Sequence, residues 1–427
     1  MVACKRRCLP CGLTVVFCVR QTMKNPPLSR RNFLKTSATG VTVTTALSYS
    51  NVLGANDRIR LGAIGTGGRC RSLMGNAKKN PDVTFTAICD VYSPRMGDAV
   101  EHAPDAKQYG DYRALLDDKT VDAVIIGSPD HWHAKMTTDA VGAGKDVYCE
   151  KPVTHSIEEG APLIKVIEAS RRVVQTGTQQ RSWEHFILGK QLVDGGALGQ
   201  ITAVRMWWYQ NYYSRVVPKD LNYAKFDQKA WLGNAPAQEV SALKYRTWRW
   251  FWDFGGGALT DLMSHWIDVV HWYTGAPTPA SAIATGQRYL LKDLECPDTL
   301  TCVLDYPKDF SATYLGQMHS AVDDGGLELR GTKATMKLDR NILTIHPEGG
   351  ERGIGAGEIK PSITIRSSGD GTIAHIRNWL DCIKSRQTPN ANIRVAVECA
   401  RACHIGNLAL RQERKVKWNA QAGRVEG

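Results

Sequence analysis

The stretch Leu61-Gly62-Ala63-Ile64-Gly65-Thr66-Gly67-Gly68-Arg69-Cys70 contains the end of an apolar run, residues 59–64, and the glycine-rich turn after it. It gives GxG and then Cys70, where the pattern GxGxxG has glycine or alanine. Glycines at a strand-to-helix turn let the backbone approach a pyrophosphate at the N-terminus of the next helix. We therefore expect cofactor contacts from Gly65, Gly67, Gly68 and Arg69. Alone the motif also fits an ordinary glycine-rich turn, and Cys70 weakens the close helix–strand packing of the third position.

Short apolar runs alternate with helical patterns outward from this stretch, from residue 58 to 176. The runs are 59–64, 83–89, 121–126, 146–149 and 173–175, and helical patterns include 134–143 and 156–170. Such alternation predicts an α/β fold with a doubly wound parallel sheet, a Rossmann domain over residues 56–178.

Residues 280–346 have a different pattern. Apolar and polar residues alternate in runs at 298–306, 310–318 and 334–338, with turn residues at 307–309 and 323–326. This predicts an open, mostly antiparallel sheet in a C-terminal substrate and oligomerisation domain, residues 179–427. A glycine-rich loop is expected at 349–357, and two helical patterns, 373–385 and 392–411, close the chain.

An acidic residue ends the second predicted strand. Asp90 lies 23 residues after Gly67. A carboxylate at this place can accept hydrogen bonds from an adenosine ribose, which favours NAD over NADP. Arg95 follows five residues later and leaves NADP open.

Two polar motifs follow the next strands, at the edge where open α/β sheets bind ligands. The first is Ser128-Pro129-Asp130-His131-Trp132-His133, and we expect Ser128, Pro129 and His133 to line a nicotinamide pocket. His131 and His133 could also bind a metal ion, but this interpretation is weaker, because the two residues are an i, i+2 pair without a third ligand nearby. We therefore expect no metal site.

The second motif is Glu150-Lys151-Pro152. A Glu-Lys pair at a strand end is ordinarily an exposed charge pair. Pro152 instead argues for a fixed turn that aims Lys151 in a set direction. A lysine beside the nicotinamide ribose could polarise a substrate oxygen or assist proton transfer, so Glu150 and Lys151 join the cofactor contacts.

Residues 258–273 form a helical pattern with two faces. One face is predicted core: Leu259, Leu262, Trp266, Val269 and Tyr273. The other carries Asp261, His265, Asp268 and Trp272 at i, i+4, i+7 and i+11. Such a stripe is more often a solvated face than a site. Here Asp261 could orient His265 and raise its pKa, as general-base chemistry at neutral pH requires.

Aromatic residues are concentrated between residues 207 and 252. Flat rings stack on the C–H faces of sugars, but Trp and Tyr are also common in sheet packing and subunit interfaces. We assign most of them to packing. Trp252, beside Asp253 and three glycines, is the best candidate for a sugar contact.

The chain resembles the Gfo/Idh/MocA family (glucose–fructose oxidoreductase, inositol dehydrogenase) from Arg58 to Trp418. The resemblance is carried by Glu150-Lys151-Pro152 and by Gly257-Ala258-Leu259-Thr260-Asp261-Leu262-Met263-Ser264-His265-Trp266-Ile267-Asp268. It implies a Rossmann domain, a C-terminal domain whose open sheet often forms the oligomer interface, and nicotinamide-dependent chemistry on sugars or cyclitols.

The resemblance also implies site roles. Lys151 is the active-site lysine, Asp261 its polar companion and His265 the acid/base. Gly65, Gly67 and Asp90 hold the cofactor. Asp268 and, from the helix at 373–385, His375 are further substrate candidates.

Three functions are compatible with these motifs. One is a sugar dehydrogenase that exchanges its cofactor. The second is an enzyme that keeps and cycles its cofactor, as in sugar–sugar oxidoreduction or NAD-dependent glycoside cleavage. The third is a catalytically silent sugar-binding protein on the same fold. Lys151, Asp261 and His265 disfavour the third, whereas the first two share every motif.

The basic charge is concentrated at the N-terminus. Residues 1–55 contribute +8 of the net +12, so we expect no nucleic-acid partner. Ser29-Arg30-Arg31-Asn32-Phe33-Leu34-Lys35 fits a twin-arginine export signal. The stretch 36–53, before a cleavage site at Leu53-Gly54-Ala55, is too polar for a membrane span, so no stable membrane insertion is expected after processing.

We therefore expect a periplasmic enzyme, cytoplasmic if the signal is unused, and Met23 as an alternative start. The eight cysteines after residue 55 lack CxxC or zinc spacing and are expected to be mostly buried. The expected partners are a small sugar or cyclitol and further copies of the chain, as a homodimer or homotetramer.

Overall fold

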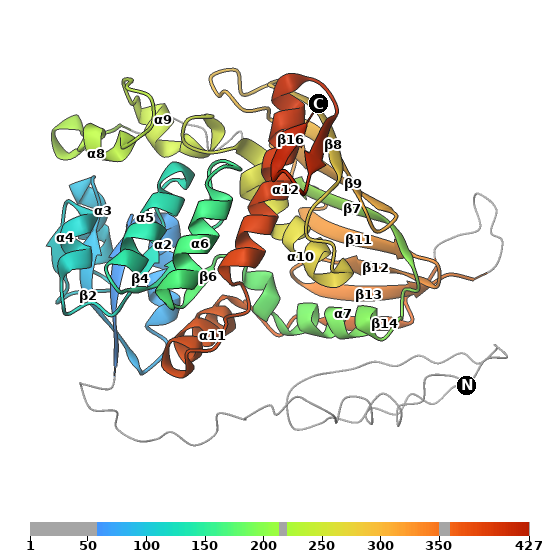
Figure 1. Cartoon of the computed structure of the whole chain (residues 1–427), viewed down its shortest axis with the longest axis horizontal. Helices are drawn as coiled ribbons and strands as arrows, with labels where there is room; N and C mark the ends of the chain where they lie inside the picture. The colour runs from blue at the N-terminus through green and yellow to red at the C-terminus, as the bar shows by residue number, and fades with distance from the viewer. Residues whose placement is uncertain (1–57, 213–219, 350–358, 427) are drawn as a thin grey trace.

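A six-stranded parallel sheet forms the N-terminal half of the molecule, in the strand order β3-β2-β1-β4-β5-β6 (Figure 1). This computed structural model describes residues 58–212, 220–349 and 359–426. The strands are β1 Ile59–Ile64, β2 Val83–Cys89, β3 Lys107–Tyr109, β4 Ala123–Ile126, β5 Asp146–Cys149 and β6 Val174–Thr176. The order reverses between β1 and β4, which makes their carboxyl ends the switch point where such folds bind ligands. The Rossmann prediction is confirmed.

Helices cover both faces of this sheet: α2 Gly68–Ala77, α3 Ser93–Ala99, α4 Tyr112–Asp117, α5 Asp130–Gly142 and α6 Gly160–Ser170. Helix α5 begins four residues earlier than expected, because Pro129 is extended and precedes the first turn, which Asp130 opens. The sequence pattern did not indicate β3, since this edge strand has only three residues and is partly exposed.

The second sheet has ten strands, in the order β14-β13-β12-β11-β7-β10-β9-β8-β15-β16. Only β7 and β10 pair in parallel; the other neighbours are antiparallel, as predicted. The bounds are β7 Ile201–Tyr209, β8 Ser281–Gln287, β9 Thr299–Tyr306, β10 Phe310–Gln317, β11 Gly325–Gly331, β12 Ala334–Leu338, β13 Ile342–Pro347, β14 Ile363–Arg366, β15 Val416–Asn419 and β16 Arg424–Glu426. Of the turn expected at 323–326, the last two residues already belong to β11.

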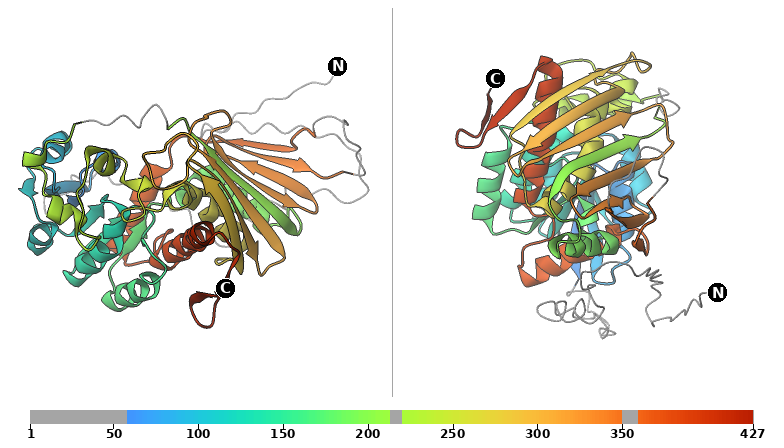
Figure 2. Two further views of the ribbon diagram at one scale, coloured as in Figure 1. Left: turned by 90° about the horizontal axis from the view of Figure 1, so that it is seen from above. Right: turned by 90° about the vertical axis from the view of Figure 1, so that its right-hand side faces the viewer.

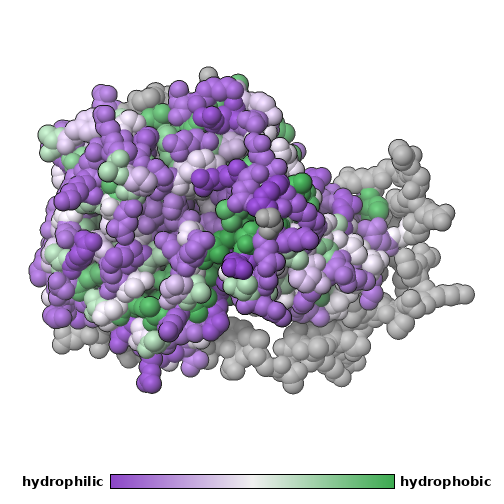
Figure 3. Space-filling view, turned by 45° about the horizontal axis from the view of Figure 1, so that its top comes forward, coloured by the Kyte–Doolittle hydropathy of each residue, from purple (hydrophilic) through white to green (hydrophobic). Residues whose placement is uncertain are grey.

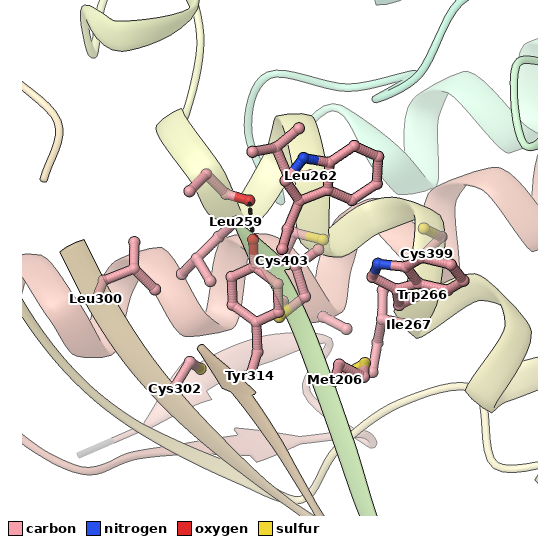
Figure 4. Close-up of a cluster of buried hydrophobic side chains, with 14 of the residues drawn as sticks. Met206, Leu259, Leu262, Trp266, Ile267, Leu300, Cys302, Tyr314, Cys399 and Cys403 are labelled. Carbon is pink, nitrogen blue, oxygen red and sulfur yellow. Dashed lines mark hydrogen bonds between the residues drawn. The ribbon is translucent and has the colours of Figure 1, made fainter. Parts of the chain in front are cut away.

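One face of this sheet packs against helices, and the right-hand view of Figure 2 looks onto the other face with the helices behind it. The packed helices are α7 Glu184–Asp194, α10 Ser264–Thr274 and α12 Ile393–Gln412. A π-helical segment, η6 Leu259–Met263, leads into α10. The predicted apolar face of 258–273 is buried throughout. Figure 4 shows Leu259, Leu262 and Trp266 of this face gathered around Tyr314 of β10 and Met206 of β7.

The last two long helices connect the two halves. Helix α11 Thr372–Ser385 packs on α2, and its Ile376, Trp379 and Leu380 belong to the core on that side of the parallel sheet. The first turns of α12 place Ile393 and Val397 in the core on the other side, whereas its later turns belong to the core of the large sheet. Because these two C-terminal helices contribute to the cores of both halves, the predicted domain boundary at residue 178 stays a prediction.

Short helices join the two halves across the top of Figure 1. They are α8 Gln228–Leu232 and α9 Ala242–Arg246, with η4 Tyr223–Lys225 and η5 Trp248–Trp250 before and after them in the chain. The short helix η2 Gln179–Ser182 instead packs on α7 and α11. The face drawn in Figure 3 is mostly hydrophilic, with hydrophobic residues in small patches.

All eight cysteines within the described ranges are buried and free, as expected. Within the same ranges no helix is both long and apolar enough to cross a membrane. The predicted export signal, and nearly all of the loop predicted at 349–357, lie outside the described residues.

Candidate active site

The glycine turn after β1 has the backbone that a dinucleotide site requires. Gly65 adopts φ +74°, and a Cβ there would lie 2.7 Å from the backbone nitrogen of Ser128. Helix α2 begins at Gly68 with Gly67 as its N-cap residue, so the first N–H groups of the helix point toward the cleft above the turn. These features fit a bound pyrophosphate.

Cys70 is accommodated in a way that the sequence pattern did not indicate. The residue is fully buried, and a Cβ on Gly127, directly after β4, would lie 2.8 Å from the Cβ of Cys70. The missing side chain at Gly127 thus makes the room that a third glycine of GxGxxG would otherwise provide. The close packing of α2 on the sheet is preserved.

Asp90 lies at the end of β2 and lines the same cleft. One carboxylate oxygen accepts a hydrogen bond from the Tyr92 backbone N–H at 2.9 Å, and the other lies 3.4 Å from the Thr66 hydroxyl. Burial raises the pKa of Asp90, although Arg95 opposes that shift. The guanidinium of Arg95 reaches over Gly67, where a Cβ would collide with it.

The cleft has a volume of about 860 Å³. Glycine-turn residues, Asp90, Ser128 and Pro129 form one wall. Residues from 224 to 248 form the other wall. Two hydrogen bonds attach this wall to the Rossmann half: the Asp227 backbone N–H donates to the Val91 carbonyl at 2.9 Å, and the Trp132 indole N–H donates to the Trp231 carbonyl at 2.8 Å.

A second cavity, about 360 Å³, adjoins the first. Both are lined by Gly127, Ser128 and Trp248, so they meet at the carboxyl end of β4. Lys151, Asp261 and His265 line the second cavity. The structure therefore brings the three predicted catalytic residues together next to the cleft.

Lys151 is held by Asp261. Its Nζ lies 2.7 Å from Asp261 Oδ1 and 2.5 Å from the Asp261 carbonyl oxygen. Arg249 Nε donates to the same Oδ1 at 3.1 Å. Despite burial, these two cations lower the pKa of Asp261 to about 2, so its carboxylate stays ionised and compensates the buried lysine. The Lys151–Pro152 peptide is cis.

His265 differs from the prediction made for it. The expectation that Asp261 orients it and raises its pKa is wrong, because Asp261 is occupied by Lys151 and Arg249. Burial, with the nearby cations Lys151 and Arg340, lowers the pKa of His265 well below its usual value. Asp261 lies within the π-helical turn η6, whereas His265 lies in the first turn of α10.

The imidazole of His265 is consequently neutral. It stacks on Trp208 of β7, with ring centroids 5.5 Å apart and planes inclined by 26°. Its Nδ1 is buried without a hydrogen-bond partner among the described residues. An unprotonated imidazole at the wall of a cavity can accept a proton from a bound hydroxyl.

Glu150 supports the junction of the two cavities. Its Oε1 accepts hydrogen bonds from Arg69 Nε at 2.8 Å and from Gln179 Nε2 at 3.1 Å. Although Glu150 is buried, the charge of Arg69 keeps the pKa of the Glu150 carboxyl low. His133 is fully buried, with Nδ1 2.6 Å from the Pro152 carbonyl and Nε2 2.9 Å from the Ser128 carbonyl. His133 thereby couples the ends of β4 and β5.

Two family models match this chain. One, described as an oxidoreductase family with an NAD-binding Rossmann fold, matches residues 59–178, and the GFO/IDH/MocA C-terminal domain matches residues 186–337. The chain belongs to the Gfo/Idh/MocA family. The resemblance seen in the sequence is confirmed, and so is the NAD-binding character of the Rossmann domain.

Named relatives match parts of this Gfo/Idh/MocA chain. Inositol 2-dehydrogenase of Salmonella typhimurium (strain LT2) is 34% identical over 142 residues, 32% of this chain and 40% of that protein. The uncharacterized oxidoreductase sll0816 of Synechocystis is 25% identical over 379 residues, 79% of this chain and 90% of that protein. The chain thus spans only about two fifths of the inositol dehydrogenase it matches.

Solved structures share the fold of this family member. Levoglucosan dehydrogenase in complex with NADH and levoglucosan superposes with a TM-score of 0.68 at 17% identity, covering 84% of this chain and 99% of that one. Myo-inositol 2-dehydrogenase of Lactobacillus plantarum gives 0.64 at 19% identity, covering 85% and 100%.

Several predicted site residues lie elsewhere in this member of the family. Asp268 lies outside the second cavity, paired with Arg181 Nε at 2.8 Å. His375 is fully buried between the Ser182 hydroxyl, 2.7 Å, and the Thr176 carbonyl, 2.8 Å. Trp252 lines neither cavity and packs under Arg411. His131 also lines neither and contacts the Trp231 carbonyl.

Other cavity residues were not predicted. The aromatic wall is Trp183, Trp208 and Trp248 in place of Trp252, and the additional polar residues are Gln179, Gln180, Arg249, Arg340 and Asp370. Arg249 stands between Trp248 and Trp250 in the sequence, but a charge beside a tryptophan occurs at many positions, and the other four polar residues lack even this signal. In the described part of the chain, no cluster of His, Cys, Asp and Glu side chains is arranged to hold a metal ion.

Proposed function

We propose that this protein is an NAD-dependent oxidoreductase that oxidises a hydroxyl group of a sugar, cyclitol or sugar derivative, or reduces the corresponding carbonyl. The observation that carries the proposal is the junction of the two cavities. A cleft with the backbone of a dinucleotide site opens at Ser128 into a smaller cavity lined by Lys151, Asp261 and His265.

The larger cleft fits the nicotinamide cofactor in shape and chemistry. Gly65, Gly67 and the first N–H groups of α2 would hold the pyrophosphate, with Gly68 and Arg69 at the start of that helix. Asp90 would accept ribose hydroxyls and disfavour a 2′-phosphate, since two negative charges would meet there. Bound NAD supplies an acceptor for the hydride that leaves the substrate carbon.

The residues of the chain divide the remaining work. His265, neutral in its buried position, accepts the proton of the reacting hydroxyl. Lys151, fixed by two bonds to Asp261, donates a hydrogen bond to the same oxygen and stabilises negative charge on it. Asp261 acts through Lys151 and Arg249, and its role is to hold these two cations.

The relatives support this assignment. The sequence relatives include inositol 2-dehydrogenases, and a solved structure of the same fold is a levoglucosan dehydrogenase complex with NADH and levoglucosan. Cyclitols and anhydrosugars share secondary hydroxyls on a compact ring, which is the chemistry that the Lys151 and His265 pair can serve.

The direct test is reduction of NAD by the purified, natively folded chain with a panel of hexoses, cyclitols, anhydrosugars and their acids. We expect absorbance of NADH to appear with at least one of them, and NAD to be used in preference to NADP. Binding of NAD without turnover of any panel member, and without any change of bound-NADH fluorescence on adding them, would contradict the proposal.

We also propose that Ser29–Lys35 directs export by the twin-arginine route to the periplasm. Fusion of residues 1–57 to a folded reporter should carry the reporter out of the cytoplasm, and changing both Arg30 and Arg31 to Lys should abolish this, because the route depends on the arginine pair. A reporter found outside the cytoplasm equally with both signals would contradict it.

We further propose that two copies of the chain associate through the helix-free face of the large sheet. Ile283 on β8 and Leu315 on β10 point outward there and are 50% and 39% exposed. Apolar side chains on an open sheet face are typical of homo-oligomer interfaces. The mass in solution should correspond to a dimer or tetramer.

A further inference from the structure

We propose that the substrate carries one negative charge, as a sugar acid does, and that Arg340 binds its carboxylate. This inference rests on the proposed function and specifies the substrate class of the same cavity. It follows from an imbalance among the charged groups of the smaller cavity.

The cavity is lined by four cationic side chains and three acidic ones. Three of the cations have carboxylate partners: Arg69 pairs with Glu150 at 2.8 Å, and Lys151 and Arg249 share Asp261 at 2.7 and 3.1 Å. The fourth cation is Arg340. Asp370, the remaining acid, is exposed and accepts its hydrogen bonds from the Thr372 backbone and hydroxyl.

Arg340 makes no ion pair with any residue in the described ranges. Its Nε is buried without a hydrogen-bond partner there. Burial and the nearby Arg69 lower the pKa of Arg340, whereas Asp324 and Asp370 act only from a distance. Arg340 as a whole is partly buried, and a partly buried guanidinium without a carboxylate partner is costly to maintain; the cost is recovered when an anion binds.

The position of Arg340 is fixed by the turn that carries it. It lies between β12 and β13, where Asp339 Oδ1 accepts from the backbone N–H groups of Asn341, 2.6 Å, and Ile342, 2.8 Å. His185 Nε2 of α7 lies 2.9 Å from the Asp339 carbonyl. The guanidinium is therefore presented by a turn held in place from two sides.

The guanidinium lies over an aromatic ring beside the catalytic group. Its Cζ is 4.8 Å from the ring centroid of Trp208, and the imidazole of His265 stacks on the same indole. Arg340 and His265 also line the same cavity, so a group bound by Arg340 shares one space with the hydroxyl that His265 deprotonates. An acid group and the reacting hydroxyl can belong to one small molecule.

A single carboxylate fits this arrangement better than the alternatives. The planar fork of arginine matches a carboxylate through two parallel hydrogen bonds. One negative charge balances the one excess positive charge of the cavity, whereas a phosphate dianion would overcompensate it. A neutral sugar would leave the guanidinium without a partner.

The experiment uses matched pairs: each hexose of the panel with its uronic acid, and with its 6-sulfate as a second singly charged form. Binding to the NADH-loaded full-length protein is measured by calorimetry, and kcat/KM by NADH formation. We expect at least one acid to be preferred over its neutral partner by about tenfold or more, the effect of a charged hydrogen bond. The Arg340→Gln variant should reduce that ratio toward one, and Arg340→Lys should recover part of it.

The matched control is Arg205→Gln. Arg205 lies on β7 with its Cζ also 4.8 Å from a neighbouring ring, that of Trp207, but on the face away from the cavity. We expect it to leave the acid-to-neutral ratio unchanged. Preference for the sulfates over the carboxylates would replace the sugar-acid class with sulfated sugars and would overturn the carboxylate assignment.

Two results separate this proposal from the proposed function. If neutral sugars are oxidised and no acid is preferred, or Arg340→Gln leaves the ratio as it was, the carboxylate site is wrong and the oxidoreductase stands. If acids bind through Arg340 and none is oxidised, the anion site stands and the oxidoreductase does not.

Discussion

Lys151→Ala should lower kcat by about 10²–10⁴-fold, the range for removal of a positioned group that assists proton transfer. The side chain is only 11% exposed and its ammonium is fixed 2.7 Å from Asp261 Oδ1, so water cannot readily replace it in the same geometry. The measurement is steady-state kcat with the best panel substrate, together with NADH affinity by fluorescence. NADH should still bind, because the glycine turn and Asp90 are untouched.

The control for this variant is Lys135→Ala. Lys135 also pairs with an aspartate, Asp139, at 2.6 Å, but on the surface with 46% exposure. Its removal should leave kcat within about twofold, as exposed pairs contribute little. Near-normal turnover in Lys151→Ala would remove that residue from the mechanism.

His265→Asn should lower kcat for oxidation by a comparable factor, about 10²–10⁴-fold, and also change the pH profile. Burial and Lys151 hold the pKa of His265 well below its usual value, so the ring is neutral at neutral pH. The base is then available throughout neutral pH, and kcat for oxidation should fall only as the pH drops far enough to protonate it. The variant should lack this acidic limb.

The pH profiles of wild type and variant are compared between pH 4.5 and 9. His102→Asn, at a residue that lines neither cavity, serves as the control and should keep the wild-type profile. A wild-type profile that rises through pH 7 with a histidine-like midpoint, and is abolished by His265→Asn, would contradict the neutral, depressed state of the ring.

The sequence predicted the parts of this molecule that local pattern determines. The five apolar runs of the Rossmann half became strands because nearly all of their residues are buried, as short, mostly apolar runs between turns indicate. The apolar face of residues 258–273 followed from helical spacing in the same way. Lys151 was indicated by the Glu-Lys-Pro motif and Asp261 by the polar stripe of its helix, whereas their pairing came from the family resemblance, and the structure joins them.

Local sequence patterns could not predict contacts between side chains that are distant in the sequence. Asp268 and His375 are polar residues at helical positions, and nothing local indicates that Arg181 and Ser182 engage them. Trp208 and Trp252 are indistinguishable as isolated tryptophans, yet only Trp208 reaches the cavity, because β7 turns it toward α10. Arg340 lines that cavity only because β12 and β13 bring their connecting turn to it.

The route of the chain through α11 and α12 has a consequence for biosynthesis. Trp379 and Val397, both from the final sixty residues, complete the cores on the two sides of a sheet whose strands are finished by Thr176. A nascent chain emerging from the ribosome therefore cannot close its first domain as soon as that domain has been made. The early sheet keeps apolar surface uncovered until α11 and α12 have been synthesised, and a chain interrupted before residue 372 presents that surface to chaperones and proteases.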